Sequence, residues 1–283
     1  MKPTAFRYER PTTVADAVAI LVADPDAKVI AGGQSLVPLM NFRLATPSTL
    51  IDLAGIDKLR HVRVEGGKLC VGARVTQREA ERSELVRDNF RLLPESLRWV
   101  GHVQIRNRGT VCGSLAHGDP ASELPAAAVA GDAELVATGP GGQRVIPAAD
   151  FYVAPLWTSL EDDEILTEVR FPVDGSDARV SVVEYARRSG DFAIAGAAIR
   201  ARATSSDLSD AAIAAFGVDG VPVRMAATEV AVRDGADQQG LAEAVATDVP
   251  APTSDGQADG AYRLDLLTEL VLRGLDECRG VER

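Results

Sequence analysis

The spacing of apolar residues predicts a helix near the start of the chain and a short buried strand after it. Apolar residues recur at helical spacing over 14–21, and Thr13 supplies an N-cap oxygen just before them. The segment Lys28-Val29-Ile30-Ala31 has the pattern of a short buried strand and leads directly into Gly32-Gly33-Gln34-Ser35. Ser35 is a natural N-cap, so a second helix is expected immediately after this glycine-rich turn.

The middle of the chain carries strand patterns interrupted by helical ones. A capping box at Thr76–Glu79 predicts the start of one helix, and a second helix is expected around 92–100. Gly66 and Gly67 predict a hairpin turn between two strands. The expected strands are 50–53, 62–64, 68–72, 133–137, 144–146 and 163–172.

A polar segment at 174–177 is a candidate linker, and a different pattern follows it. Residues 181–185, 197–203 and 210–218 predict three antiparallel strands. The chain turns helical and alanine-rich from about residue 224, and it ends in an amphipathic helix through Leu264 and Leu275. The fold class is therefore α+β, with a boundary near 173–180.

Composition and charge exclude several classes of protein. A chain of 283 residues has room for about two domains at roughly 100–200 residues each. The net charge of -11 argues against nucleic-acid binding and against docking on anionic membranes. No apolar run reaches the ~20 residues of a membrane span, and the N-terminus lacks the apolar stretch of a signal peptide. We expect a cytoplasmic protein with no transmembrane segment.

The cysteines and histidines do not form a metal-binding pattern. Cys70, Cys112 and Cys278 are far apart, which is typical of a protein from a reducing compartment. The sequence contains no CxxC motif and only three histidines. A structural zinc or an iron–sulfur cluster held by this chain alone is not expected.

Two glycine-containing segments are candidate phosphate-binding sites. In 31–35, adjacent glycines allow close approach of an anion to successive backbone N–H groups, although a plain tight turn is the commoner reason for two glycines between a strand and a helix. The segment 110–123 combines a glycine with small hydroxyl side chains, and Asp119-Pro120 is expected to start a helix there. Neither segment is a G-x-G-x-x-G or Walker A motif. Two such segments in one chain favour a ligand with two phosphates.

Other candidate groups have simpler explanations. His102, His117 and Asp119 lack an accompanying nucleophile motif, so a hydrolase is not favoured. Arg106–Arg108 is either a basic patch for phosphate or a solvated loop. Arg187 and Arg188 with Asp191, the acidic run 161–164, and Trp99 and Trp157 also have surface or core explanations.

Several segments resemble a known family. Residues 31–40 and 113–125 resemble the two FAD-binding signatures of the medium, flavoprotein subunit of the xanthine dehydrogenase and aerobic carbon monoxide dehydrogenase family of molybdenum hydroxylases. Residues 6–12, 164–172, 186–193 and 261–263 also fit that family. The resemblance covers nearly the whole chain in order. One departure is Cys112, which replaces the first of two glycines usual in the second signature.

The resemblance implies a fold and a set of cofactor-binding residues. It implies an FAD-binding domain of the vanillyl-alcohol-oxidase (PCMH) type over 1–175, with lobes of about 1–55 and 56–175. A smaller domain with a three-stranded antiparallel sheet and helices is expected over 178–283. The residues implied to bind FAD are Ile30, Ala31, Gly32, Gly33, Gln34, Ser35, Leu36, Thr110, Gly113, Ser114, His117, Glu123, Leu166 and Phe192. Residues 31–35 would hold the diphosphate, and Phe192 would lie near the isoalloxazine ring.

The resemblance also implies partners. The chain would carry FAD and pass electrons from 2Fe–2S clusters of a small subunit to an external acceptor, with no catalytic residue of its own. A large subunit would hold the molybdopterin cytosine dinucleotide, and the whole would be a dimer of heterotrimers. The alternatives are a stand-alone flavoenzyme of the same fold and a non-catalytic nucleotide-binding assembly protein.

Overall fold

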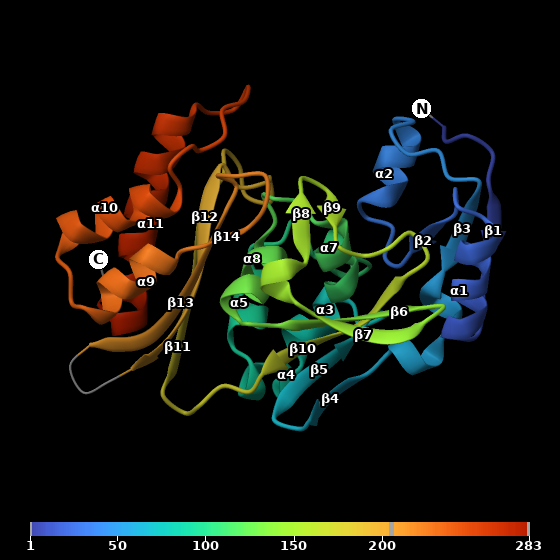
Figure 1. The fold of residues 1–283 in the computed structure, drawn as a ribbon, viewed down its shortest axis with the longest axis horizontal. Coiled ribbons are helices and arrows are strands. Elements are labelled where there is room, and N and C mark those ends of the chain that lie inside the picture. Colours follow the sequence, from blue (N-terminus) through green and yellow to red (C-terminus); the bar gives the residue numbers. More distant parts are fainter. Residues whose placement is uncertain (1, 204–206, 282–283) are drawn as a thin grey trace.

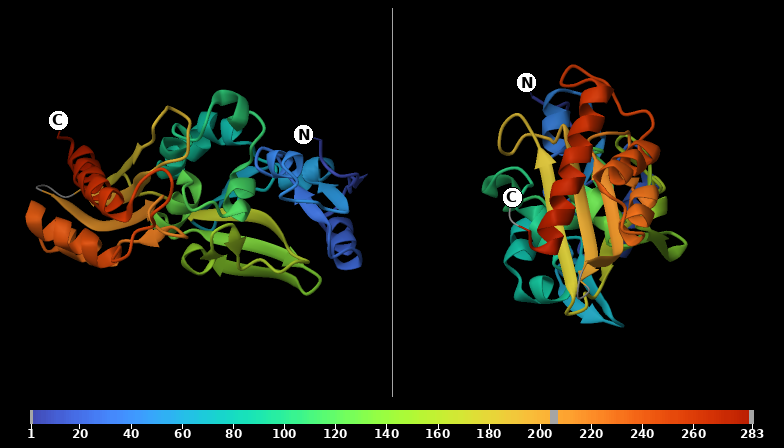
Figure 2. Two further views of the ribbon diagram at one scale, coloured as in Figure 1. Left: turned by 90° about the horizontal axis from the view of Figure 1, so that it is seen from above. Right: turned by 90° about the vertical axis from the view of Figure 1, so that its left-hand side faces the viewer.

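The computed structural model describes residues 2–203 and 207–281 as three blocks along one long axis (Figure 1). An N-terminal lobe lies at one end, a larger middle block follows, and the C-terminal block lies at the other end. Figure 2 shows the two end blocks on opposite sides of the middle block. The chain passes from the middle sheet to the C-terminal sheet between Pro172 and Ala178.

The N-terminal lobe is a small parallel sheet with two helices. Its strands are ordered β1-β3-β2 and both pairs are parallel. The Thr13 side chain accepts a hydrogen bond from the backbone N–H of Asp16 at 3.1 Å, which confirms the predicted cap. The bounds are β1 (Arg7–Glu9), α1 (Val14–Ala23), β2 (Lys28–Ile30), α2 (Leu36–Asn41) and β3 (Thr49–Asp52).

The middle block is built on a five-stranded antiparallel sheet. The strand order is β4-β5-β10-β6-β7, so β10, the last strand in sequence, lies at the centre. Gly66 and Gly67 have positive φ angles of 58° and 75°, as the predicted hairpin turn requires. The bounds are β4 (Val62–Glu65), β5 (Lys68–Gly72), β6 (Glu134–Gly139), β7 (Gly142–Pro147) and β10 (Ile165–Pro172), with a separate hairpin of β8 (Tyr152–Ala154) and β9 (Trp157–Thr158).

Six short helices cover this sheet. The capping box of Thr76 and Glu79 is present at the start of the first of them, as predicted. Three helices, α4, α6 and α7, were not predicted. The bounds are α3 (Gln77–Arg82), α4 (Glu84–Asn89), α5 (Leu92–Leu97), α6 (Val103–Arg106), α7 (Val111–His117) and α8 (Glu123–Ala130). All eight residues of α8 are buried, so this helix forms the centre of the molecule.

The C-terminal block is an antiparallel sheet between the middle block and three helices. Its order is β11-β12-β13-β14, so a two-residue fourth strand adds to the three that the sequence predicts. One face of this sheet packs on α8, and the other is covered by the last helices. The bounds are β11 (Ala178–Tyr185), β12 (Ala195–Ala203), β13 (Leu208–Phe216), β14 (Val223–Arg224), α9 (Ala226–Arg233), α10 (Gln238–Asp248) and α11 (Gly260–Arg279).

Over the described residues, no helix combines the length and the apolar character needed to cross a membrane.

Candidate functional site

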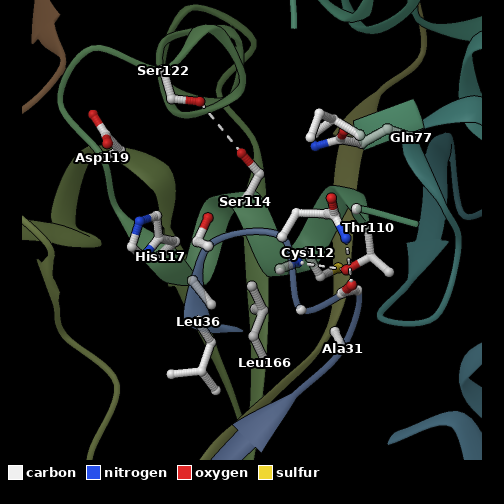
Figure 3. A pocket seen from close by; sticks show the side chains of 18 of the residues that line it. Ala31, Leu36, Gln77, Thr110, Cys112, Ser114, His117, Asp119, Ser122 and Leu166 are labelled. Atoms are coloured by element: carbon white, nitrogen blue, oxygen red, sulfur yellow. Dashed lines mark hydrogen bonds between the residues drawn. The ribbon is translucent and has the colours of Figure 1, made fainter. Parts of the chain in front are cut away.

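A cavity of about 530 Å³ opens where the blocks meet. Its walls come from the loop between β2 and α2, the start of α3, helix α7, the start of α8 and the start of β10. The loop between β11 and β12 reaches it from the C-terminal block through residues 190–192. Side chains from α7 and the β2–α2 loop meet in this space (Figure 3).

The first glycine-rich segment touches the backbone of another loop. A Cβ on Gly32 would lie 2.1 Å from the carbonyl oxygen of Arg108 and 2.6 Å from the Cα of Gly109. Only glycine permits this approach. Gly33 has a positive φ of 74°, which also favours glycine. The segment 31–35 therefore packs, backbone against backbone, on the middle block and joins the N-terminal lobe to it.

The same segment presents unused hydrogen-bond donors. No hydrogen bond to another described residue uses the backbone N–H of Gly33, Gln34, Ser35 or Leu36. Ser35 occupies the predicted cap position, but its side chain caps nothing in the helix. Backbone N–H groups without partners are rare unless they face solvent or a ligand. This row of donors lines the cavity and can bind an anion.

The first part of the second segment is a helix, α7, rather than a turn. The helix start predicted at Asp119-Pro120 is wrong. Helix α7 begins after Thr110, whose side chain accepts from the N–H of Gly113 at 3.0 Å. It ends at Gly118, which has a left-handed φ of 63°. Asp119 is not a helix cap: its carboxylate accepts from the N–H of Ala121 in a turn, and the next helix starts only at Glu123.

Helix α7 explains why Cys112 is compatible with the site. The position is helical and does not need a positive φ, so a Cβ costs nothing there. Its side chain points into the core, and the thiol lies 3.5 Å from the carbonyl oxygen of Val71. Burial raises the pKa of this thiol, which keeps it protonated and unreactive. The glycine that the site needs is Gly113, where a Cβ would lie 2.6 Å from the Thr110 hydroxyl.

Polar side chains cluster at the far end of α7. The Ser122 hydroxyl lies 3.4 Å from the Ser114 hydroxyl (Figure 3). It also lies 3.4 Å from the Glu123 carboxylate. Glu123 is only 8% exposed, and burial raises its pKa to about 7. Burial lowers the pKa of His117, so its imidazole is neutral at pH 7. This end of the cavity offers hydroxyl, imidazole and carboxyl groups to a polar ligand.

The structure brings almost all the predicted site residues to one place. Ile30 is the exception: it lines a neighbouring groove beside Tyr8. Leu166 is buried in the cavity wall, whereas Phe192 is 62% exposed at its edge. The predicted residues that line the cavity are Ala31, Gly32, Gly33, Gln34, Ser35, Leu36, Thr110, Gly113, Ser114, His117, Glu123, Leu166 and Phe192.

Gln77 lines the cavity and was not predicted as a site residue. It is only 4% exposed, and its amide oxygen is buried without a hydrogen-bond partner among the described residues. Its position next to Thr76 in the capping box assigned it to helix α3 but gave no sign that its side chain turns toward the cavity. The Gln77 amide oxygen is therefore a hydrogen-bond acceptor that a polar ligand or a water in the cavity can use.

The other candidate groups have structural partners. Arg106 pairs with Glu81 at 3.2 Å and donates to the carbonyl of Val100, so it does not form a free phosphate patch. Arg187 donates to the carbonyl of Gln257. In the acidic run, Glu164 pairs with Arg144 at 2.7 Å. Across the described residues, no group of three or more His, Cys, Asp or Glu could hold a metal ion.

The chain matches two family models that together span almost its whole length. Residues 4–174 match the FAD binding domain in molybdopterin dehydrogenase. Residues 181–278 match the CO dehydrogenase flavoprotein C-terminal domain.

Relatives and solved structures agree with these models. The chain is 34% identical to the carbon monoxide dehydrogenase medium chain of Hydrogenophaga pseudoflava, over 98% of each chain. It is 40% identical to the caffeine dehydrogenase subunit beta of a Pseudomonas strain, over 81% of this chain and 78% of the other. A structure of carbon monoxide dehydrogenase from Hydrogenophaga pseudoflava superposes with a TM-score of 0.95 at 34% identity, covering 99% of both chains. These matches show that the chain belongs to the family of FAD-binding medium subunits of molybdopterin dehydrogenases, and that it is an oxidoreductase subunit.

Proposed function

We propose that the cavity holds FAD with its diphosphate against the row of free backbone N–H groups in 33–36. The main support for this proposal is that these donors line the cavity and have no hydrogen-bond partner among the described residues. Successive backbone N–H groups bind an anion without a lysine, so a chain with a net charge of -11 can still hold a diphosphate here. Gly32 and Gly113 keep the two walls close together, so the diphosphate is held between them.

Different residues of the cavity would bind different parts of the cofactor. The Thr110 and Ser114 side chains lie on the α7 wall opposite the donors, and Glu123 with His117 would contact hydroxyl groups of the cofactor. Gln77, with its unpaired amide oxygen, would accept a hydrogen bond from the cofactor. When bound, FAD accepts and releases electrons singly or in pairs, and the protein supplies its orientation and potential. The apolar side chains of Leu53, Leu160 and Leu166 also line the cavity and would keep water away from part of the cofactor.

The chain acts as the electron-transfer subunit of a heteromeric molybdenum hydroxylase. Electrons would come from 2Fe–2S clusters of a small partner subunit and leave to an external acceptor. A large partner subunit would hold the molybdopterin cofactor and read the substrate, in a dimer of heterotrimers.

Purification of the native protein from its host tests this assignment. We expect one larger and one smaller chain to elute with it, together with FAD, iron, sulfide and molybdenum. A chain that elutes alone with bound flavin would instead support the stand-alone flavoenzyme. A chain that elutes alone without flavin would support the assembly protein.

Substitution of Phe192 by alanine should change the flavin but not the fold. The Phe192 side chain is largely exposed at the cavity edge, so its removal should change stability by no more than about 0.5 kcal/mol. If the ring lies near the isoalloxazine, the flavin absorption spectrum or midpoint potential of the assembled complex should shift.

Phe42→Ala is the matched control for this prediction. Phe42 is as exposed as Phe192 but does not line the cavity. A Phe192→Ala complex with a flavin spectrum and potential identical to those of wild type and Phe42→Ala would remove Phe192 from the site.

A further inference from the structure

Arg263 is a buried charged residue that lies outside the cofactor cavity. It stands near the start of α11, is 3% exposed and does not line the cavity. Its Nη2 pairs with the Asp255 carboxylate at 2.7 Å, and its Nη1 donates to the carbonyl oxygens of Ile194 and Gly217. One guanidinium therefore holds three segments that are far apart in the sequence.

The first of these segments is the loop between β11 and β12. Residues 190–192 of this loop line the cavity, and Ile194 follows them at one end of the loop. The other end reaches the same place: Arg187 donates to the carbonyl of Gln257, whose N–H donates to the Asp255 carboxylate at 2.8 Å. Both ends of the loop are therefore fastened to one ion pair.

The tip of the same loop lies against the middle block. Gly190 has a positive φ of 86°, and a Cβ on it would lie 2.6 Å from the ring of His102. His102 comes directly before α6 and follows Gly101, which lines the cavity. A shift at the fastened ends of the loop therefore moves residues that face the cavity.

The second segment connects Arg263 to the turn between α7 and α8. Gly217, whose carbonyl accepts from Arg263, has its own N–H bonded to the carbonyl oxygen of Pro120 at 2.8 Å. In the same turn, Asp119 and Ser122 line the cavity. Gly217 also has a positive φ of 75°, and a Cβ on it would lie 2.9 Å from a carbonyl oxygen of the β11–β12 loop. The turn and the loop are thus joined through one glycine that Arg263 holds.

We propose that Arg263 is a positioning residue for the cofactor, which fixes the 190–192 loop and the 119–122 turn in the wall of the cavity. Its guanidinium is planar and presents its donors in fixed directions, so the two carbonyls and the carboxylate share one geometry. It stays charged at any pH at which the protein is folded, so the link is permanent. This inference rests on the proposed binding of FAD in the cavity.

FAD binding to the assembled complex tests this role. In Arg263→Met the two carbonyls lose their shared donor, so the loop and the turn are no longer held together. We expect the FAD dissociation constant, from titration of the deflavinated complex, to rise about 2-fold to 30-fold. The flavin midpoint potential should shift as well. Arg263→Lys keeps a charged donor that can serve the carbonyls, and it should restore part of both values.

Leu267→Ala separates positioning from stability. Leu267 lies one turn further along α11, is fully buried, and belongs to the core under the C-terminal helices. Its truncation should lower the melting temperature about as Arg263→Met does, because it leaves a cavity in that core. Below both melting temperatures, its FAD affinity and midpoint potential should equal those of wild type. Wild-type values in Arg263→Met, or equal changes in Leu267→Ala, overturn the proposal.

Asp255→Asn keeps the test decisive if Arg263→Met does not assemble. The Asp255 side chain is 51% exposed, so its replacement should leave the chain folded while removing the charge that orients the guanidinium. We expect a smaller rise of the FAD dissociation constant than in Arg263→Met. Wild-type FAD affinity in both Asp255→Asn and Arg263→Lys would then overturn the proposal.

Hydrogen–deuterium exchange separates this inference from the proposed function, because it needs no bound flavin. The N–H of Gly217 and the segments 119–122 and 190–194 should exchange faster in Arg263→Met, but not in Leu267→Ala. Unchanged exchange in these segments would overturn the positioning role. A wild-type complex without FAD would contradict the proposed function, whereas the exchange rates would still report on what Arg263 holds.

Discussion

Substitution of Gly32 by alanine is expected to empty the cavity of flavin. The new Cβ would lie 2.1 Å from the Arg108 carbonyl oxygen, far inside any real contact. The obstacle is backbone, so no side chain can rotate away, and the N-terminal lobe must move off the middle block. Overpacking of this kind costs about 1–3 kcal/mol. If that cost falls on the bound state, FAD affinity decreases about 5-fold to 150-fold.

The measurement is the amount of FAD per chain in the purified complex, by acid extraction and fluorescence. We expect Gly32→Ala to retain little of the wild-type flavin and to regain part of it in excess FAD. Gly141→Ala is the matched control, because a Cβ there meets nothing within 4 Å and the position has no positive φ. Wild-type flavin content in a folded Gly32→Ala complex would contradict the proposed cradle.

Loss of Arg263 is expected to cause the largest fall in stability. Arg263, on α11, is 3% exposed, and its guanidinium donates to the carbonyls of Ile194 and Gly217 and pairs with Asp255 at 2.7 Å. It ties the last helix to the ends of β13 and of the loop that carries Phe192. In Arg263→Met both carbonyls lose their charged donor, which should cost about 3–5 kcal/mol.

Thermal unfolding of the full chain checks this expectation. The melting temperature should fall by roughly 6–20 °C at about 2–4 °C per kcal/mol. Arg263→Lys, which keeps a donor, should fall between wild type and Arg263→Met. Arg273→Met is the control: Arg273 lies on the same helix but makes only an exposed pair with Glu277, worth about 0–1 kcal/mol. Equal melting temperatures for Arg263→Met and Arg273→Met would show that the buried guanidinium does not hold the last helix to the end of β13 and to the loop that carries Phe192.

Local sequence signals predicted much of the fold. The caps at Thr13 and Thr76, the glycine turn at 66–67 and the alternating strands all appear in the structure, because each depends on neighbouring residues alone. The start of α8 was misplaced because an Asp-Pro pair suits both a helix start and a turn. Only tertiary contacts decide between them: Gly118 ends α7 early, and the chain needs 119–121 to turn before Glu123.

The part of the site that binds through backbone N–H groups could be predicted from its glycines. The segment 31–35 could be identified because two adjacent glycines before a helix mark a close approach. Gln77 could not, because its significance lies in the burial of its amide oxygen without a partner among the described residues. The distance between Gly32 and the Arg108 carbonyl likewise depends on segments more than seventy residues apart in the sequence.

The position of FAD in the native complex tests the central claim most directly. An electron cryo-microscopy map of the complex purified from its host would show it. We expect one FAD in the cavity of this chain, with its diphosphate against the backbone N–H groups of 33–36 and facing the Thr110 end of α7. A complex that contains flavin elsewhere, or that leaves this cavity without density while its partners are present, would contradict it.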